Sequence, residues 1–365
     1  MRKLKIIISG GGTAGHIFPA VAIAKSIEER ISNVEFLFVG AQDRMEMHKI
    51  PAFGYKIRGL WISGFQRKFD FKNLIVPFKL IHSVLKSVNI INKFNPDIVI
   101  GTGGYASGPL IYTASKKGIP AIIQEQNSYA GITNKILGNY VEKICVAYEG
   151  MNSFFPKDKI ILTGNPIRKD ILECHDKKEQ GLISFDIDAS KSTILVFGGS
   201  LGARTINNTI LNNIKVFQEM NVNLIWQTGL DFYKTAKKCV DDINIKGITS
   251  HPFIKDMSEA YAVSDIIISR AGAITISELC CVGKPVILVP SPNVAENHQY
   301  KNAQSLVNKN AALLVEDRES NRKLVDTVKN LIRNKALQQE LSHNIKKMGI
   351  KDAGSKIADI ALSLL

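Results

Sequence analysis

A glycine-rich turn close to the start of the chain combines a phosphate-binding pattern with a histidine. Residues 10–16 read GGGTAGH and follow the apolar stretch 4–9. A turn of this kind, between a strand and a helix, lets backbone N–H groups approach a phosphate. His16 falls where the helix should begin, and the positive end of that helix would keep its imidazole neutral, as a general base requires. His16 is therefore a candidate base; the alternative is a histidine that only caps or packs against the helix.

The same pattern occurs again in the second half of the chain. Residues 193–197 are apolar, and residues 198–203 read GGSLGA. A further stretch, GTGGYASGP at residues 101–109, follows the apolar residues 98–100. Backbone N–H groups in such loops can form an anion site, although a tight turn with close helix packing also uses glycines. We expect each half to offer a glycine loop to a phosphate or diphosphate, with Ser200 as a hydroxyl donor.

Polar residues also follow the predicted strand at 121–124. The sequence there is QEQN at 124–127, and the carboxyl ends of parallel strands are where open α/β sheets bind their ligands. Glu125 is a second candidate for the general base. Asn127 could bind a hydroxyl group.

The stretch SRAGAITISE at 269–278 is the most specific motif. Its small residues 271–273 would let the backbone touch a ligand, and the Glu278 carboxylate could accept hydrogen bonds from two vicinal hydroxyls, as a ribose presents. Thr275 and Glu278 also have the spacing of a capping box, which is the alternative for both. Amides farther along that could bind sugar hydroxyls are Asn297, Gln299 and Asn302.

Strand and helix patterns alternate along both halves of the chain. This alternation predicts an α/β fold with parallel sheets covered on both faces. The sequence Gly-Asn-Pro at 164–166 is the candidate domain junction. Residues 174–191 should be a polar surface excursion, and 352–365 a helix that docks on a domain. The predicted strands are 4–9, 34–39, 97–101, 121–124, 143–146, 159–162, 193–197, 223–227, 265–269 and 285–289, and the predicted helices are 20–30, 107–117, 205–220 and 275–282.

Length and composition indicate two domains of a globular protein. The chain has 365 residues, 45% of them hydrophobic, and no run of 18 apolar residues that could span a membrane. Its N-terminus is expected to be the first strand of a mature protein and not a signal peptide. Five cysteines without a C-x-x-C pair predict neither a disulfide framework nor a zinc site. No cluster of metal-ligand spacing occurs, so no metal is expected.

The net charge of +14 favours polyanionic partners: nucleic acid, an anionic membrane or phosphorylated ligands. The alternative is that charges are scattered over solvated faces. Residues 71–94 mix apolar side chains with lysines, a pattern typical of a segment that binds a membrane surface. The alternative is an ordinary amphipathic helix whose apolar face belongs to the core.

Several of these motifs occur together in one known family. The chain resembles the MurG family, in which N-acetylglucosamine is transferred from UDP-N-acetylglucosamine to the 4-hydroxyl of the N-acetylmuramoyl group of lipid I, giving lipid II for peptidoglycan. The resemblance covers essentially the whole chain. The motifs that carry it are residues 11–16, 103–109, 125–127, 164–168, 198–203 and 277–278.

The resemblance implies a GT-B fold, with two Rossmann-like doubly wound domains facing a central cleft. Residues 1–164 would bind lipid I and contact the membrane, with the C-terminal helix at about 350–365 packing back on them. Residues 165–349 would bind UDP-N-acetylglucosamine. The enzyme would be peripheral, at the cytoplasmic face of the cell membrane, with an anionic membrane surface and cell-wall synthesis and division proteins as partners, and without a cofactor or nucleic acid.

The resemblance also implies roles for individual residues, with His16 and Glu125 as candidate catalytic groups. The family commonly has glycine where this chain has Ala14, which weakens that one contact. Residues implied at the acceptor diphosphate are Gly12, Gly103, Gly104, Tyr105 and Ser107. Residues implied at the donor are Thr13, Ala14, Gly15, Asn127, Arg168, Ser200, Ile254, Ala273, Ile274, Thr275, Ile276, Ser277, Glu278, Gln299 and Asn302.

Other functions remain open from the residues themselves. The chain could be another UDP-sugar transferase that acts on a glycolipid, or a UDP-sugar epimerase. A nicotinamide oxidoreductase would use the G-x-G-x-x-G pattern of Gly10, Gly12 and Gly15. That class also needs an acid at the end of the second strand, and none occurs before Asp43. A nucleic-acid binder is disfavoured because no basic run is interleaved with aromatic residues.

Overall fold

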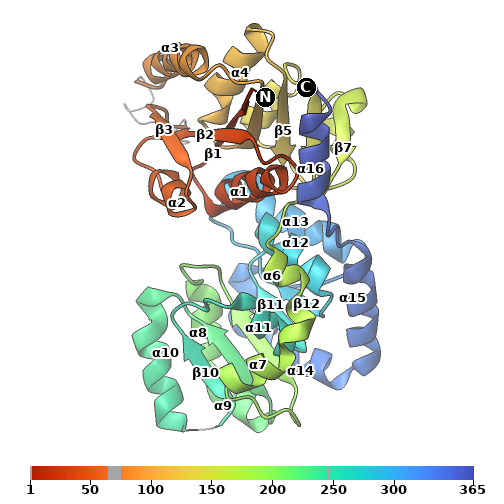
Figure 1. Ribbon diagram of the computed structural model, residues 1–365. Helices are drawn as coiled ribbons and strands as arrows, with labels where there is room; N and C mark the ends of the chain where they lie inside the picture. Colours follow the sequence, from red (N-terminus) through yellow and green to blue (C-terminus); the bar gives the residue numbers. More distant parts are fainter. Residues whose placement is uncertain (1, 65–74, 245) are drawn as a thin grey trace. The chain divides into compact units, whose positions relative to one another are not determined.

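The computed structural model describes residues 2–64, 75–244 and 246–365. The chain forms two compact units (Figure 1). Unit 1 contains Met1–Ile167 and Asp352–Leu365, and unit 2 contains Arg168–Lys351. Each unit is built around one parallel sheet.

The sheet of unit 1 has seven strands in the order β3-β2-β1-β4-β5-β6-β7. All its pairings are parallel, as predicted. Apolar side chains alternate across it: Ile6 and Ile8 pack on one face and Ile7 on the other. The strands are β1 (Leu4–Gly10), β2 (Val34–Ala41), β3 (Lys56–Leu60), β4 (Ile98–Gly103), β5 (Ala121–Glu125), β6 (Lys143–Val146) and β7 (Ile160–Leu162).

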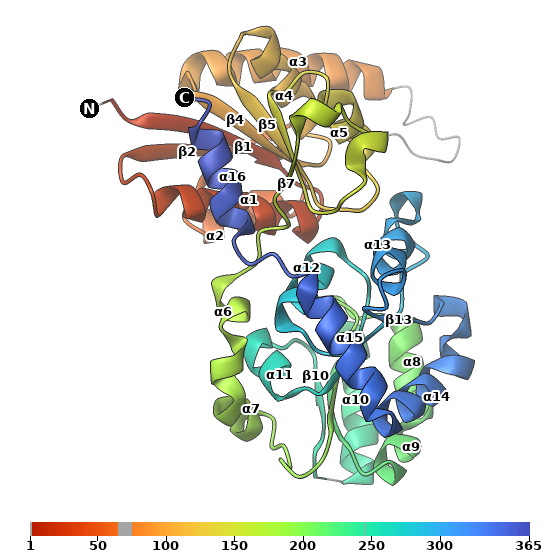
Figure 2. The ribbon, with the colours of Figure 1, turned by 90° about the vertical axis from the view of Figure 1, so that its right-hand side faces the viewer.

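Helices cover both faces of this sheet. One face packs against α1, α2 and α16, and the other against α3, α4 and α5 (Figure 2). This is the doubly wound arrangement that strand–helix alternation predicts. The helices are α1 (Ala14–Glu28), α2 (Glu46–Ala52), α3 (Val76–Phe94), α4 (Ser107–Lys116), α5 (Ile132–Leu137) and α16 (Ala353–Leu362).

Helix α16, from the end of the chain, lies beside α1 (Figure 2). It buries Ile357 and Ala361 in the cluster that lines α1, and Arg30 donates to Asp359 at 2.6 Å. A Cβ at Gly354 would lie 2.6 Å from the Ser26 hydroxyl, so glycine permits the close approach of the two helices. Burying a side chain such as Ile357 contributes about 1.5–3 kcal/mol.

Unit 2 has a six-stranded parallel sheet in the order β10-β9-β8-β11-β12-β13. Its strands are β8 (Thr193–Phe197), β9 (Asn223–Gln227), β10 (Ile248–His251), β11 (Ile266–Ser269), β12 (Val286–Leu288) and β13 (Leu313–Leu314). Its helices are α6 (Lys169–Leu172), α7 (Lys178–Ser184), α8 (Arg204–Asn212), α9 (Ile214–Glu219), α10 (Leu230–Ile243), α11 (Met257–Val263), α12 (Ala273–Val282), α13 (His298–Val307), α14 (Ser320–Arg333) and α15 (Lys335–Lys347).

One local prediction in unit 2 is wrong. The helix expected over 205–220 is interrupted at Asn213, and two helices, α8 and α9, form in its place. The Asn213 side chain donates to the Thr209 carbonyl at 2.8 Å, one turn earlier. The stretch 174–191 is largely exposed, as predicted. It also contains the buried Cys174 and helix α7, which packs on α11 and buries Gly181.

Candidate functional site

The glycine loops lie where each sheet reverses its strand order. In unit 1 the order changes between β1 and β4, and in unit 2 between β8 and β11. Open α/β sheets bind ligands at such points, outside the carboxyl ends of the strands. The loops at 10–16 and 101–109 therefore share the switch point of unit 1, and those at 198–203 and 270–273 share that of unit 2.

The two loops of unit 1 are held against each other by their backbones. The Gly11 N–H donates to the Gly103 carbonyl at 3.3 Å. Gly104 has φ of +87°, and a Cβ there would overlap the Gly11 carbonyl oxygen, so only glycine allows this approach. The Thr102 hydroxyl adds a bond to the His16 carbonyl at 2.9 Å. Ser107 is buried and donates to backbone carbonyls, including that of Gly103 at 2.9 Å, so it builds the second loop.

His16 lies in the first turn of α1. Its Nδ1 is 2.8 Å from the Gly11 carbonyl oxygen and 3.3 Å from the Thr13 hydroxyl. A carbonyl only accepts hydrogen bonds, so Nδ1 of the neutral ring carries the proton and Nε2 carries the lone pair. The ring edge faces Gly103, where a Cβ would lie 3.0 Å from Nε2. This tautomer is the one that a general base acting through Nε2 needs.

Glu125, the second candidate base, is surrounded by donors. Its buried carboxylate accepts from the backbone and side-chain N–H groups of Asn127, at 3.1 and 3.2 Å. It also accepts from the Gly131 N–H at 3.0 Å and the Asn134 side chain at 2.8 Å. A carboxylate that accepts four such bonds holds the loop between Glu125 and α5. Because these bonds already engage its two oxygens, the geometry favours His16 over Glu125 as the candidate base.

In unit 2, Gln227 joins two of the predicted donor loops. It ends β9, donates to the Gly199 carbonyl at 3.0 Å and accepts from the Ile254 N–H at 2.8 Å. The Ile254 N–H is thus bonded by a side chain of the protein. Ser200 is exposed at the tip of the first loop. Gln227 is not among the residues predicted for the site, although a polar residue at the carboxyl end of a buried strand is the signal that identified Glu125.

Glu278 lies on α12 against the buried Tyr261, whose hydroxyl donates to it at 3.2 Å. Burial raises the pKa of Glu278 to about 7, while the Arg168 guanidinium and the Tyr261 hydrogen bond oppose that rise. Arg168, half exposed, also forms an ion pair with Asp170 at 3.2 Å. The capping-box alternative fails, because Gly272 is the N-cap of α12 and Glu278 lies in the second turn.

The other predicted donor residues of unit 2 surround the start of α12 and α13. Ser277 donates to the Ala273 carbonyl at 3.1 Å, one turn earlier. The buried Asn302 side chain is 3.4 Å from the Ala271 carbonyl, and the Gln299 side chain accepts from the Ser291 N–H at 2.9 Å. The Asn302 contact ties α13 to the small-residue turn before α12, and the Gln299 contact ties α13 to the segment after β12. Ile274, Thr275 and Ile276 are the next residues of α12.

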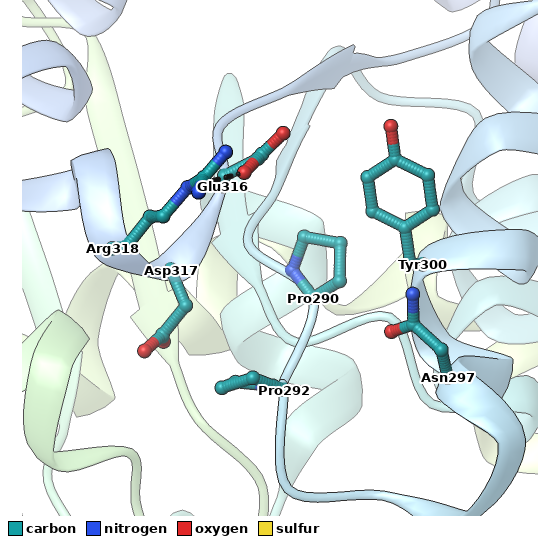
Figure 3. A pocket seen from close by; sticks show the side chains of 7 residues that line it. All are labelled: Pro290, Pro292, Asn297, Tyr300, Glu316, Asp317 and Arg318. Atoms are coloured by element: carbon teal, nitrogen blue, oxygen red, sulfur yellow. Dashed lines mark hydrogen bonds and ion pairs between the residues drawn. The ribbon is translucent and has the colours of Figure 1, made fainter.

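A pocket of about 450 Å³ opens beside α13 (Figure 3). It lies beyond the carboxyl ends of β12 and β13, and on one side of it Arg318 donates to Glu316 at 2.8 Å. Arg270, from the turn after β11, pairs with Asp317 and donates to the Val289 carbonyl at 3.0 Å. The pocket is lined by Pro290, Pro292, Asn297, Tyr300, Glu316, Asp317 and Arg318.

Comparison with known structures supports the same fold. A crystal structure of Acinetobacter baumannii MurG matches with a TM-score of 0.81 and 27% identity, over 99% of this chain and 100% of that one. A UDP-GlcNAc 2-epimerase from Neisseria meningitidis matches with a TM-score of 0.69 at 16% identity, over 99% and 100% of the two chains. At that identity the second match shows the fold alone, so the fold does not separate a transferase from an epimerase.

Sequence comparison separates them. The glycosyltransferase family 28 N-terminal domain matches residues 6–146, and the C-terminal domain of that family matches residues 193–357. A relative from Parabacteroides distasonis is 50% identical over 100% of this chain and 99% of its own length. One from Flavobacterium psychrophilum is 48% identical over the same shares. Both are named UDP-N-acetylglucosamine--N-acetylmuramyl-(pentapeptide) pyrophosphoryl-undecaprenol N-acetylglucosamine transferase. The chain therefore belongs to the MurG family of glycosyltransferases.

Proposed function

We propose that this protein transfers N-acetylglucosamine from UDP-N-acetylglucosamine to lipid I and so forms lipid II for peptidoglycan synthesis. The observation that carries the proposal is the 50% identity to a transferase of this name along the whole chain. The structure adds glycine loops at both switch points, a histidine in the tautomer of a base, and a carboxylate on α12 suited to a ribose. Unit 1 binds lipid I and unit 2 binds the sugar nucleotide.

In this mechanism the acceptor hydroxyl of lipid I attacks the anomeric carbon from the side opposite UDP. The new C–O bond forms as the bond to the diphosphate oxygen breaks, which inverts the anomeric centre and gives a β-1,4 linkage. Nε2 of His16 takes the hydroxyl proton, a step that general-base catalysis accelerates by about 10²–10⁴. The electron pair leaves on UDP, whose growing charge is stabilised by Arg168 and by the 198–203 loop, at about 3–4 kcal/mol per preorganised donor.

The donor contacts divide among the loops of unit 2. Glu278 accepts from the ribose hydroxyls, the Ile254 carbonyl contacts the uracil, and Gln299 and Asn302 contact the diphosphate and the sugar. In unit 1, the first N–H groups of α1 lie outside its intrahelical ladder and are suited to a phosphate. Asn127 and residues Thr13 to Gly15 reach the donor sugar, and Gly103 to Tyr105 contact the lipid diphosphate.

A surface on α3 suits contact with the lipid bilayer that carries lipid I. This helix buries the small polar Ser83 and Ser87 and exposes Phe78, Ile81 and Leu85, by 69%, 60% and 66%. The helix buries Val76 and packs on the core of unit 1 through Ile91, and its exposed apolar side chains support the membrane-surface alternative. Lys79 lies on the same helix, over the Trp61 ring. Lys72, which belongs to the segment 71–94 predicted to bind a membrane surface, lies outside the described residues.

We infer that the enzyme binds the cytoplasmic face of the membrane peripherally. None of the helices in the described ranges is long and apolar enough to cross a bilayer. The exposed residues of α3 would enter the interface between headgroups and acyl chains, and the net charge of +14 would attract anionic lipids. This placement brings unit 1 to the surface where the lipid-linked acceptor is embedded.

The test of the activity is an assay with labelled UDP-N-acetylglucosamine, with and without a short-chain lipid I analogue. A transferase forms a labelled disaccharide only when the acceptor is present. An epimerase, which shares the fold, would convert the sugar without any acceptor. Conversion without acceptor would overturn the proposal, and so would the absence of disaccharide when it is supplied.

A further inference from the structure

A buried carboxylate outside the predicted site reaches the first glycine loop. Glu46 is the first residue of α2 and is 0% exposed. Its Oε2 accepts from the Gly12 N–H at 2.9 Å, and its Oε1 accepts from the Ala41 N–H at 2.9 Å. Both oxygens thus bond backbone donors, one in the loop after β1 and one at the end of β2.

Two glycines make room for this carboxylate. A Cβ at Gly11 would overlap the Glu46 carboxyl group, and a Cβ at Gly40 would overlap its side chain. The glycines after β1 therefore serve a protein side chain as well as any ligand. Because the Gly12 N–H donates to Glu46, the contact that the sequence analysis gave Gly12 with the acceptor diphosphate does not use this N–H group.

The Gly12 N–H and the Gly11 carbonyl belong to one planar peptide group. Glu46 accepts from the N–H end, and Nδ1 of His16 donates to the carbonyl end at 2.8 Å. Hydrogen bonds at the two ends of an amide polarise each other, because negative charge at the N–H strengthens the carbonyl as an acceptor. A carboxylate that orients a histidine often contacts the ring directly; here one peptide group intervenes.

We propose that Glu46 is a positioning residue that fixes the tautomer and orientation of His16 through the Gly11–Gly12 peptide group. This inference rests on the proposed role of His16 as the base. The carboxylate favours the Nδ1–H tautomer, which leaves the lone pair on Nε2, and it stabilises the imidazolium that forms when Nε2 takes the acceptor proton. The uncharged contacts of the ring with Thr13 and Gly103 cannot supply that charge.

The first test needs no variant. In the wild-type protein with ¹⁵N-labelled histidine, NMR should show His16 as the Nδ1–H tautomer. When His16 is titrated, the amide shift of Gly12 should move with the same midpoint as the ring, because the two share one peptide group. A Gly12 amide that is indifferent to the His16 titration would overturn the proposal.

The second test is Glu46→Gln, because an amide can accept from only one of the two backbone donors. We expect a share of Nε2–H tautomer and an acidic limb of kcat at lower pH. kcat should fall about tenfold or more, while KM for UDP-N-acetylglucosamine stays within about twofold because most of the proposed donor contacts lie in unit 2. A carboxylate that only builds the loop would lower kcat and leave the tautomer and the limb in place, which would refute the proposal.

The matched control is Glu142→Gln. Glu142 also accepts from a backbone N–H in unit 1, that of Ala121 at 2.6 Å, but at the amino end of β5, away from the loops. It should leave the His16 signals and the pH profile unchanged. If Glu46→Gln does not fold, a Gly12 amide that does not follow the His16 titration in the wild type still overturns the proposal. If His16→Ala keeps full turnover, the base assignment fails, while the NMR results still decide whether Glu46 positions the ring.

Discussion

The hydroxyl of the buried Tyr261 donates a hydrogen bond to the partly buried Glu278 carboxyl at 3.2 Å, on α12 of unit 2. Burial raises the pKa of Glu278 from 4.5 to about 7, so near neutral pH the group is only partly ionised. A ribose with two hydroxyl donors needs the ionised form. If Glu278 binds the ribose as proposed, donor binding and the protonation of Glu278 are linked.

This linkage predicts that the affinity for UDP-N-acetylglucosamine falls as pH decreases below about 7, by up to about tenfold per pH unit. The sugar nucleotide is the right probe because its diphosphate does not titrate in this range. Calorimetry from pH 5.5 to 8.5 measures the effect. Glu278→Gln should bind weakly without this pH dependence, and Tyr261→Phe should move the midpoint upward because it removes a donor that stabilises the carboxylate. Equal affinity at pH 6 and pH 8 in the wild type would argue against the ribose contact.

The raised pKa of Glu278 also determines how the free energy of unfolding changes with pH. The folded pKa of Glu278 lies above the unfolded value, so the native state binds more protons between pH 4.5 and about 7. The contribution of this group to the free energy of unfolding therefore decreases as pH rises through that window. As pH rises from 4.5 to about 7, the free energy of unfolding should decrease less in Glu278→Gln than in the wild type.

Gln227 predicts a second effect on donor binding. Because it bonds both Gly199 and Ile254, Gln227→Ala leaves the two loops without their shared partner, and we expect UDP affinity to fall about tenfold. The exposed Gln218 of the same unit is the matched control. Gln218→Ala should bind UDP as the wild type does. Unchanged binding in Gln227→Ala would show that the loops hold their positions without it.

The exposed face of α3 predicts membrane binding. The double variant Phe78→Ser and Leu85→Ser should lose most of its sedimentation with anionic liposomes and keep its Tm, because both side chains are exposed in the folded protein. Ile183, 83% exposed in unit 2, offers the control Ile183→Ser. Liposome binding that survives the double variant would assign the contact to another surface.

The hydrogen bonds of Glu125 predict that its substitution lowers the stability of the protein and leaves proton transfer unchanged. In Glu125→Gln, the side-chain NH₂ group would face N–H donors from which the carboxylate of the wild type accepts hydrogen bonds. The free energy of unfolding should therefore decrease by about 2 kcal/mol or more. The Tm should fall, and the acidic limb of the kcat profile should stay where it is. A shift of that limb would return Glu125 to the list of candidate bases.

The fold could be predicted where the sequence pattern is local. Central strands such as β1 and β8 are short apolar runs that end in glycine, and their positions are confirmed. The edge strands β3 and β13 were missed because one alternates exposed lysine and arginine with apolar residues and the other has two residues. A strand with half-exposed sides gives a weak signal.

The sequence predicted those residues of the candidate site that lie next to glycine turns. His16 and Ser200 follow from that position alone. Glu46 and Gln227 act across 34 and 27 residues on backbone groups of other loops. Nothing in the sequence around Glu46 distinguishes a helix-starting glutamate from one that bonds a distant peptide, so only the packing of α2 against β2 and β3 reveals it.

The measurement that tests the account most directly is a single-turnover assay of His16→Ala, with wild type beside it. Enzyme saturated with labelled UDP-N-acetylglucosamine is mixed with a lipid I analogue, and the disaccharide is followed over time, with donor affinity measured separately. We predict a rate reduced by about 10²–10⁴ with donor affinity within about twofold. Transfer at the wild-type rate would contradict the assignment of His16 as the base on which the mechanism depends.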